Sequence, residues 1–207
     1  MILQVGLKKW DLSKKIMKYK VGIFGSAANN KEEVLYKAQE LGEVLAKYKD
    51  KIILITGVAD GLPHKVVQTA SKNGVEVWGF SAGYDEKGQK KLSPSHDLAI
   101  YKKIFYVSED YPLVHNIDAC RKYRNVTSTA TCDAGIIISG RWGTMNEFTN
   151  LHDMGKVIGV FTQTGGIADE LPNLMKKIHK KSKAKVLFSN SMNQLIPSIL
   201  TQLRKRA

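Results

Sequence analysis

A glycine-rich turn at residues 139–144 carries the strongest chemical signal in this 207-residue sequence. The turn reads Ser-Gly-Arg-Trp-Gly-Thr, follows the apolar run 136–138 and leads directly into a helix-like stretch. Its two glycines let the chain curl so that successive N–H groups point inward, and the N-terminus of the following helix adds about half a positive charge. This pattern predicts a phosphate site. The residues expected there are Gly140, Arg141, Gly143 and Thr144.

Two charged side chains, those of Arg124 and Glu147, are the candidates for chemistry at that site. Glu147 follows Thr144 by three residues, so it either faces the ligand or completes a Thr-x-x-Glu capping box that stabilises the helix start. Arg124 lies on a predicted helix and shares a face with Arg121 and Asn125. Its guanidinium can hold a phosphate through two hydrogen bonds, or it can form a surface salt bridge. The spacing alone leaves both pairs of alternatives open.

Two earlier turns also combine glycines with hydroxyl side chains. Gly25 and Ser26 follow the first predicted strand, and Thr56, Gly57 and Gly61 follow the second. Glycines in such turns let backbone N–H groups approach a phosphate or a ribose. The second turn is not a Walker A loop, because no Gly-Lys-Ser/Thr follows it. The first strand is not followed by Gly-x-Gly-x-x-Gly, which disfavours NAD-dependent chemistry.

Short, apolar, β-branched runs alternate with longer helix-like stretches along the chain. Runs without polar alternation are typical of strands covered on both faces, and the alternation with helices predicts right-handed crossovers. We therefore predict an α/β fold, a Rossmann-like, doubly wound, mostly parallel sheet of about seven strands with helices on both faces. Ligands of such sheets bind beyond the carboxyl ends of the strands, where the turns lie. The predicted strands are Lys20–Phe24, Ile52–Thr56, Val75–Phe80, Ile104–Val107, Ala134–Ser139, Val157–Phe161 and Lys185–Phe188.

The domain organisation is expected to be simple, with a single Rossmann-like domain over 17–207 and an N-terminal extension over 1–16. Asn30 is the expected N-cap of the first helix, with Glu33 three residues further on. The polar segment 81–102 is long for a connection, and such segments can cover a ligand site.

The formal net charge of +13 would attract polyanions such as nucleic acid, nucleotides or acidic lipid. Lysines cluster between Lys8 and Lys20, and again between Lys176 and Lys185. These clusters are either solvated helix faces or part of a nucleic-acid footprint. The solvated faces are favoured, because lysine runs are common on protein surfaces.

Composition and residue spacing exclude several other classes of protein. A hydrophobic share of 43% and a charged share of 25% are not those of a disordered chain. No apolar run reaches the ~18 residues of a membrane span, and the N-terminus lacks the apolar core of a signal peptide, so a cytoplasmic protein is expected. Two cysteines, Cys120 and Cys132, do not make a disulfide framework. The five histidines show no ligand spacing, so no metal site is predicted. Trp78 and Trp142 are expected to pack rather than to stack on a ligand.

Three motifs together resemble the LONELY GUY-type proteins, a family once labelled lysine decarboxylases. They are Arg124-Asn125, Asp133-Ala134 and Gly140-x-x-Gly143-Thr144-x-x-Glu147, and the similarity runs from about Lys20 to about Phe161. The resemblance implies a Rossmann-like fold, usually a homodimer, that binds an AMP-like nucleoside monophosphate and requires no cofactor. Cytokinin-activating members hydrolyse the N-glycosidic bond to free base and ribose 5-phosphate. Carried over, Arg124 and Glu147 form the catalytic pair, and the Gly140–Thr144 loop binds the phosphate. The further nucleotide-binding residues are then Gly25, Ser26, Thr56, Gly57, Gly61 and Asn125.

This sequence departs from the family pattern in two places. The family's Pro-Gly-Gly becomes Ser139-Gly140-Arg141, and its Arg-Lys becomes Arg124-Asn125. The second change is similar to a molybdenum-cofactor carrier-like branch, which implies a nucleotide or cofactor carrier without turnover as the alternative to a phosphoribohydrolase. A weaker similarity, over Thr56–His64, Val75–Gly83 and Tyr111-Pro112, is to the DNA-processing protein A family and implies single-stranded DNA binding.

Overall fold

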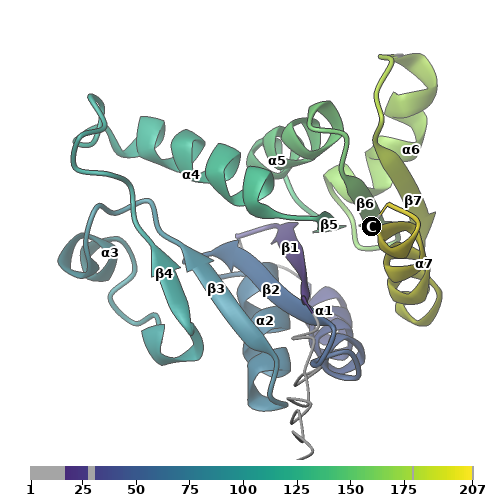
Figure 1. The fold of residues 1–207 in the computed structure, drawn as a ribbon, viewed down its shortest axis with the longest axis horizontal. Helices are drawn as coiled ribbons and strands as arrows, with labels where there is room; N and C mark the ends of the chain where they lie inside the picture. Colours follow the sequence, from purple (N-terminus) through teal and green to yellow (C-terminus); the bar gives the residue numbers. More distant parts are fainter. Residues whose placement is uncertain (1–16, 28–30, 179, 207) are drawn as a thin grey trace, which may run out of the picture.

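The computed structural model describes residues 17–27, 31–178 and 180–206 (Figure 1). The strands are β1 (Tyr19–Gly25), β2 (Ile52–Gly57), β3 (Glu76–Phe80), β4 (Lys103–Phe105), β5 (Ala134–Ile138), β6 (Val157–Phe161) and β7 (Lys185–Ser189). The helices are α1 (Glu32–Ala46), α2 (Leu62–Lys72), α3 (Glu86–Leu92), α4 (Ile117–Thr131), α5 (Trp142–Asp153), α6 (Ile167–Lys177) and α7 (Met192–Arg204), with a 3-10 turn η1 (Leu98–Ile100). All seven predicted strands are present, with bounds that differ by up to two residues.

The strands form one sheet in the order β4-β3-β2-β1-β5-β6-β7, and every neighbouring pair is parallel. One apolar cluster packs α1, α2 and α7 against the sheet, and a second packs α5 and α6 against the other face, where α4 also lies (Figure 1). The central strands are apolar throughout because both faces are covered, as in β5, whose five residues are all buried. The predicted doubly wound α/β fold is confirmed. None of the described helices is both long and apolar enough to cross a membrane.

The strand order reverses at β1, which has β2 on one side and β5 on the other. The chain leaves β1 toward one face of the sheet and β5 toward the opposite face, so a crevice opens at their carboxyl ends. Gly25 ends β1 here, and a Cβ at this position would collide with the carbonyl oxygen of Ile138, the last residue of β5. A glycine is therefore needed for the two strands to end side by side.

Three local expectations are changed or left open by the structure. Helix α5 begins at Trp142 with Arg141 as its N-cap, so Thr144 lies inside the first turn and does not cap the helix. The 81–102 segment contains a helix and a 3-10 turn rather than a continuous loop. The predicted extension 1–16 and the predicted cap Asn30 lie outside the described residues.

Candidate phosphate-binding site

A cavity of about 140 Å³ lies where the strand order reverses, at the carboxyl ends of β1 and β5. The turn after β1, helix α4 and the first turns of α5 enclose it. Motifs that are more than a hundred residues apart in sequence therefore share one cavity. The residues that line it are Gly25, Ser26, Ala27, Arg124, Asn125, Arg141, Gly143, Thr144 and Glu147.

The turn after β2 supports the wall of this cavity but does not line it. The hydroxyl of buried Thr56 donates to the carbonyl oxygen of Ile23 at 3.2 Å, which ties β2 to β1. Gly61 has φ 110° and packs against the backbone of Ser26, and the Leu62 N–H donates to the Ser26 carbonyl at 2.9 Å. A side chain at position 61 would both strain the backbone and displace the Ser26 turn.

Arg124 is held against Gly57 at the floor of the cavity. A Cβ at Gly57 would stand 3.2 Å from Arg124 Cζ, so the absence of a side chain there makes room for the guanidinium. Burial lowers the pKa of Arg124, and the carboxylate of Glu147 opposes that shift. The next residue, Asn125, donates from Nδ2 to Asn146 Oδ1 at 3.1 Å and so links α4 to α5. Arg124 thus presents a fixed positive charge to the cavity.

Glu147 lies on α5 and also faces the cavity. Because the helix starts at Trp142, the capping-box alternative for Thr144 and Glu147 is excluded. Burial raises the pKa of Glu147 to about 7, while Arg124 and, to a smaller degree, Lys122 act to lower it. In the described part of the chain, Glu147 and Arg124 form no ion pair within 4.0 Å. Two opposite charges therefore line one cavity with space between them, as a ligand would require.

The N-terminus of α5 points its first amide groups toward the same cavity. Its N-cap residue, Arg141, makes no side-chain capping bond, and the first helical hydrogen bond runs from the Met145 N–H to the Arg141 carbonyl at 2.9 Å. The N–H groups of Gly143 and Thr144 have no acceptor among the described residues. A Cβ at Gly143 would meet nothing within 4 Å, so the space in front of this turn is open. Such a turn offers donors and a partial positive charge to an anion.

The loop that precedes α5 is braced by the turn between β6 and α6. Ser139 and Gly140 both have positive φ angles, 52° and 105°. These two left-handed residues turn the chain from the end of β5 into the start of α5. The Ser139 N–H donates to Thr164 Oγ1 at 2.8 Å, and the Ile167 N–H donates to the Gly140 carbonyl at 2.9 Å. A Cβ at Gly166 would collide with the Gly140 carbonyl oxygen, so the two turns are in backbone contact.

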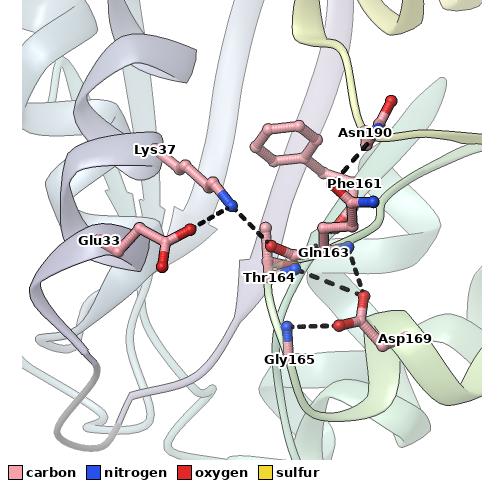
Figure 2. Close-up of polar contacts among 8 residues, drawn as sticks. All are labelled: Glu33, Lys37, Phe161, Gln163, Thr164, Gly165, Asp169 and Asn190. Atoms are coloured by element: carbon pink, nitrogen blue, oxygen red, sulfur yellow. Dashed lines mark hydrogen bonds and ion pairs between the residues drawn. The ribbon is translucent and has the colours of Figure 1, made fainter.

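That bracing turn is itself fixed by Asp169, as Figure 2 shows. The carboxylate of Asp169 accepts from the Gln163 N–H at 2.6 Å and from the Gly165 N–H at 2.8 Å. Lys37 of α1 donates to the Gln163 carbonyl at 2.9 Å and pairs with Glu33 at 2.8 Å (Figure 2). Sequence reasoning missed these residues. The signal was the glycine pair after β6 with an aspartate a few residues later, since a carboxylate can fill such a turn of N–H groups.

The family model that matches the chain is described as the SLOG cluster4 family, and it covers residues 18–196. The chain belongs to the SLOG cluster4 family. This confirms the resemblance to the superfamily of LONELY GUY-type and DNA-processing protein A-like proteins. No curated protein matches the sequence significantly.

Solved structures share the fold of this SLOG cluster4 protein at low sequence identity. The protein TM1055 has a TM-score of 0.70 at 20% identity, with 90% of this chain and 99% of that chain covered. A molybdenum cofactor carrier protein from Chlamydomonas reinhardtii has a TM-score of 0.63 at 16% identity, with 91% and 99% covered. DNA processing protein A from Streptococcus pneumoniae has a TM-score of 0.62 at 17% identity, with 87% of this chain but 61% of that chain covered.

The two tryptophans of interest in this SLOG cluster4 protein differ in their surroundings. Trp78 packs as expected, since its Nε1–H donates to Glu76 at 2.8 Å and the ammonium of Lys103 lies 4.8 Å from its ring. The same expectation for Trp142 is wrong, because its side chain is 82% exposed. Trp142 opens α5 between Arg141 and Gly143, and it lines a neighbouring pocket that shares Arg141 with the cavity.

A cluster of two histidines and one aspartate forms where the turn after β2, the start of α2 and the 81–102 segment meet. Asp60, His64 and His96 bring one ligand-type atom each to within 4.8 Å of one another. His96 is buried and contacts Asp60 through Nδ1 and the Tyr101 hydroxyl through Nε2, both at 2.8 Å. Burial, and secondarily His96, lower the pKa of His64. Spacing along the chain did not reveal this cluster, because the fold brings His96 to it from a distant segment.

Proposed function

We propose that this SLOG cluster4 protein binds a nucleoside 5′-monophosphate in the cavity and hydrolyses its N-glycosidic bond to free base and ribose 5-phosphate. One observation carries the proposal: Arg124 and Glu147 line the same small cavity, at the free N-terminus of α5. The chemistry of this reaction needs an anion site for the phosphate and a carboxylate near the reacting carbon.

The phosphate is best accommodated at the first turn of α5. The N–H groups of Gly143 and Thr144 would donate to it, and Arg141 would add a positive charge from the exposed side. The cavity of about 140 Å³ is smaller than the roughly 300–1,000 Å³ of pockets that enclose a whole ligand. The phosphoribosyl group therefore suits the interior, and the base would extend past Arg141 toward the neighbouring pocket, where the exposed Trp142 ring is available for stacking.

Glycosidic cleavage develops positive charge on the ribose ring, and Glu147 is placed to stabilise it. In the proposed step, a water oxygen bonds to C1′ and the bond from C1′ to the base nitrogen breaks. The electron pair of that bond leaves with the base, which takes up a proton, and the attacking water loses one. Arg124 would hold the phosphate or ribose, so that binding energy at a distance from C1′ positions the reacting carbon.

A carrier that binds the same class of ligand without turnover is the second candidate. Arg141 stands where the family has its second glycine, so a second guanidinium lines the cavity and favours retention of an anionic ligand. The fold similarity to two molybdenum cofactor proteins, with TM-scores of 0.63 and 0.64, is compatible with this alternative.

A panel of purine and pyrimidine monophosphates separates the candidates. Release of free base by the wild-type protein, measured by chromatography, supports the hydrolase. Retention of a ligand through purification, with no base released from any monophosphate, supports the carrier and rejects the hydrolase. A salt-dependent gel shift of a labelled single-stranded oligonucleotide, without nucleotide binding, would instead favour the DNA-binding alternative.

We also infer that the protein forms a homodimer through the face that carries α4, α5 and α6. This face has an apolar groove of about 310 Å³ between α5 and α6, and Ile178 beside it is 64% exposed. Val126 of α4 is also exposed, at 44%. An isologous interface requires a sizeable apolar patch of this kind.

A further inference from the structure

The histidine cluster next to the β2–α2 turn has the composition of a metal site. Asp60 comes from the turn itself, His64 from the first turn of α2, and His96 from the segment between α3 and η1. The rings of His64 and His96 have their centroids 4.2 Å apart at an interplanar angle of 50°. Two imidazoles and a carboxylate thus converge from three separate segments of the chain.

His64 is the residue that hydrogen bonding leaves unexplained. Its Nδ1 is buried and has no hydrogen-bond partner in the described part of the chain, a condition that Asn150 Nδ2 alone shares there. A buried polar atom without a partner destabilises the folded state, and an apolar side chain would fill the same space without that cost. A ligand that accepts a nitrogen lone pair would supply the missing partner.

We propose that Asp60, His64 and His96 bind one divalent transition-metal ion of the Zn²⁺ type. Neutral imidazole and carboxylate are the donors that such ions prefer. Metal–ligand bonds of about 2.0–2.2 Å place the donor atoms of a tetrahedral site roughly 3.3 Å apart. The donor atoms here lie within 4.8 Å of one another, and Asp60 Oδ1 is 2.8 Å from His96 Nδ1. Because the Asp60 side chain is 63% exposed, it is free to move away from His96 and admit an ion between the two.

His96 is already oriented for this role by Tyr101. With a metal ion on Nδ1, the Nε2–H of His96 donates to the Tyr101 hydroxyl at the 2.8 Å that the structure shows. Metal-binding histidines commonly use their second nitrogen in this way, which fixes the ring and its tautomer. Tyr101 is buried, so water does not replace its hydroxyl as the partner of His96 Nε2.

The site lies beside the phosphate cavity. Gly57 and Gly61 flank Asp60 in sequence, and they contact Arg124 and the Ser26 turn, respectively. Three protein ligands leave a fourth position of a tetrahedral ion open to water or to an anionic oxygen. The metal proposal does not depend on the proposed hydrolysis, because its test measures metal binding alone.

The test is Zn²⁺ titration of the untagged, full-length protein by calorimetry, with Co²⁺ absorption as a spectroscopic probe. We expect one Zn²⁺ per chain and an intense visible Co²⁺ band typical of tetrahedral coordination. His64→Leu, His96→Ala and Asp60→Ala should each weaken Zn²⁺ binding by about 100-fold or more. Tyr101→Phe should weaken it by about 10–100-fold and keep the Co²⁺ band. His115→Ala is the matched control, because His115 is exposed and lies outside the cluster.

His64→Leu is the decisive variant. The Nδ1 of His64 has no hydrogen bond to lose, and leucine fills a similar space in the buried site. If His64→Leu binds Zn²⁺ as tightly as wild type, the proposal is overturned. It is also overturned if wild type binds no more Zn²⁺ than the variant lacking all three ligands. The cluster would then be a hydrogen-bonded chain from Asp60 through His96 to Tyr101.

Discussion

The guanidinium of Arg124 lies directly over Gly57, with 3.2 Å between Arg124 Cζ and the position a Cβ at residue 57 would take. Gly57 ends β2 and Arg124 lies on α4, so this contact joins the sheet to the helix that covers it. It also sets how far the charge of Arg124 reaches into the cavity. The first prediction tests this relationship.

Gly57→Ala should weaken nucleotide binding by moving the Arg124 guanidinium a few tenths of an ångström, with the fold retained. The measurement is calorimetric titration with AMP in a double-mutant cycle. In an Arg124→Ala background, the same Gly57→Ala change should have little further effect, because the group it displaces is gone. Equal losses in both backgrounds would show that Gly57 acts through something other than Arg124.

Gly143→Val should abolish the binding of AMP-like ligands by filling the open space in front of the α5 N-terminus. The fold should survive, because a Cβ at residue 143 would meet no atom within 4 Å. Thr149→Val is the matched control, since it places the same residue type on an exposed position of the same helix. Circular dichroism checks folding and calorimetry checks binding. Unchanged affinity in a folded Gly143→Val protein would refute the phosphate site.

Glu147→Gln should reduce base release by orders of magnitude and leave phosphate affinity largely intact. A carboxamide has no charge to stabilise a ribosyl cation, but it retains the size of the carboxylate. Arg124→Ala should lower both affinity and rate, because it removes a ligand contact. Steady-state kinetics with separate kcat and KM values distinguishes the two effects. Full activity in Glu147→Gln would mean that a different group supplies the negative charge.

The buried carboxyl of Glu147 should also make stability depend on pH. Its pKa of about 7 in the folded state lies above the ordinary 4.5, so the folded state holds an extra proton between these values. The associated stability is fully present below about pH 4.5 and is lost as pH rises through 7. Above pH 7, Glu147→Gln should therefore be more stable than wild type by about 3 kcal/mol, and the difference should vanish near pH 4.5. Urea unfolding at several pH values between 4.5 and 8 measures this difference in stability. Glu170→Gln, at an exposed position of α6, is the control.

The dimer prediction is tested by sedimentation at micromolar concentration. Wild type should sediment as a dimer, and Ile178→Glu should shift the equilibrium toward monomer by placing a charge beside the apolar groove. Leu92→Glu, at an exposed position of α3, should leave the assembly unchanged. A monomer at all concentrations would exclude this interface.

The fold and most of the cavity wall could be predicted from the sequence because both follow local rules. Apolar runs such as 136–138 predict strands buried on both faces, and Gly140 and Gly143 predict a turn that curls around an anion. The helix start was misplaced by three residues, at Met145 instead of Trp142, because Trp142 and Gly143 are poor helix signals on their own. That small shift excludes the capping role of Glu147.

The contacts that sequence reasoning missed are between residues that are far apart in the chain. Nothing near His64 in sequence points to His96, and nothing near Gly140 points to Asp169. Each of these contacts exists because the parallel sheet brings the turns after several strands to one edge. Trp142 was misjudged for a related reason, since its exposure depends on where the loop before α5 directs the chain.

The turn held by Asp169 has a consequence for how mutational data on this protein should be interpreted. Asp169 is not among the residues that line the cavity, yet it fixes Gln163 and Gly165, and the turn they form supports the Ser139 loop. Lys37 reaches the same turn from α1, on the opposite side of the sheet. In a saturation screen scored on ligand binding, substitutions at these positions would be grouped with the binding residues. The sensitive positions would therefore include residues that do not touch the ligand but hold the phosphate loop in place.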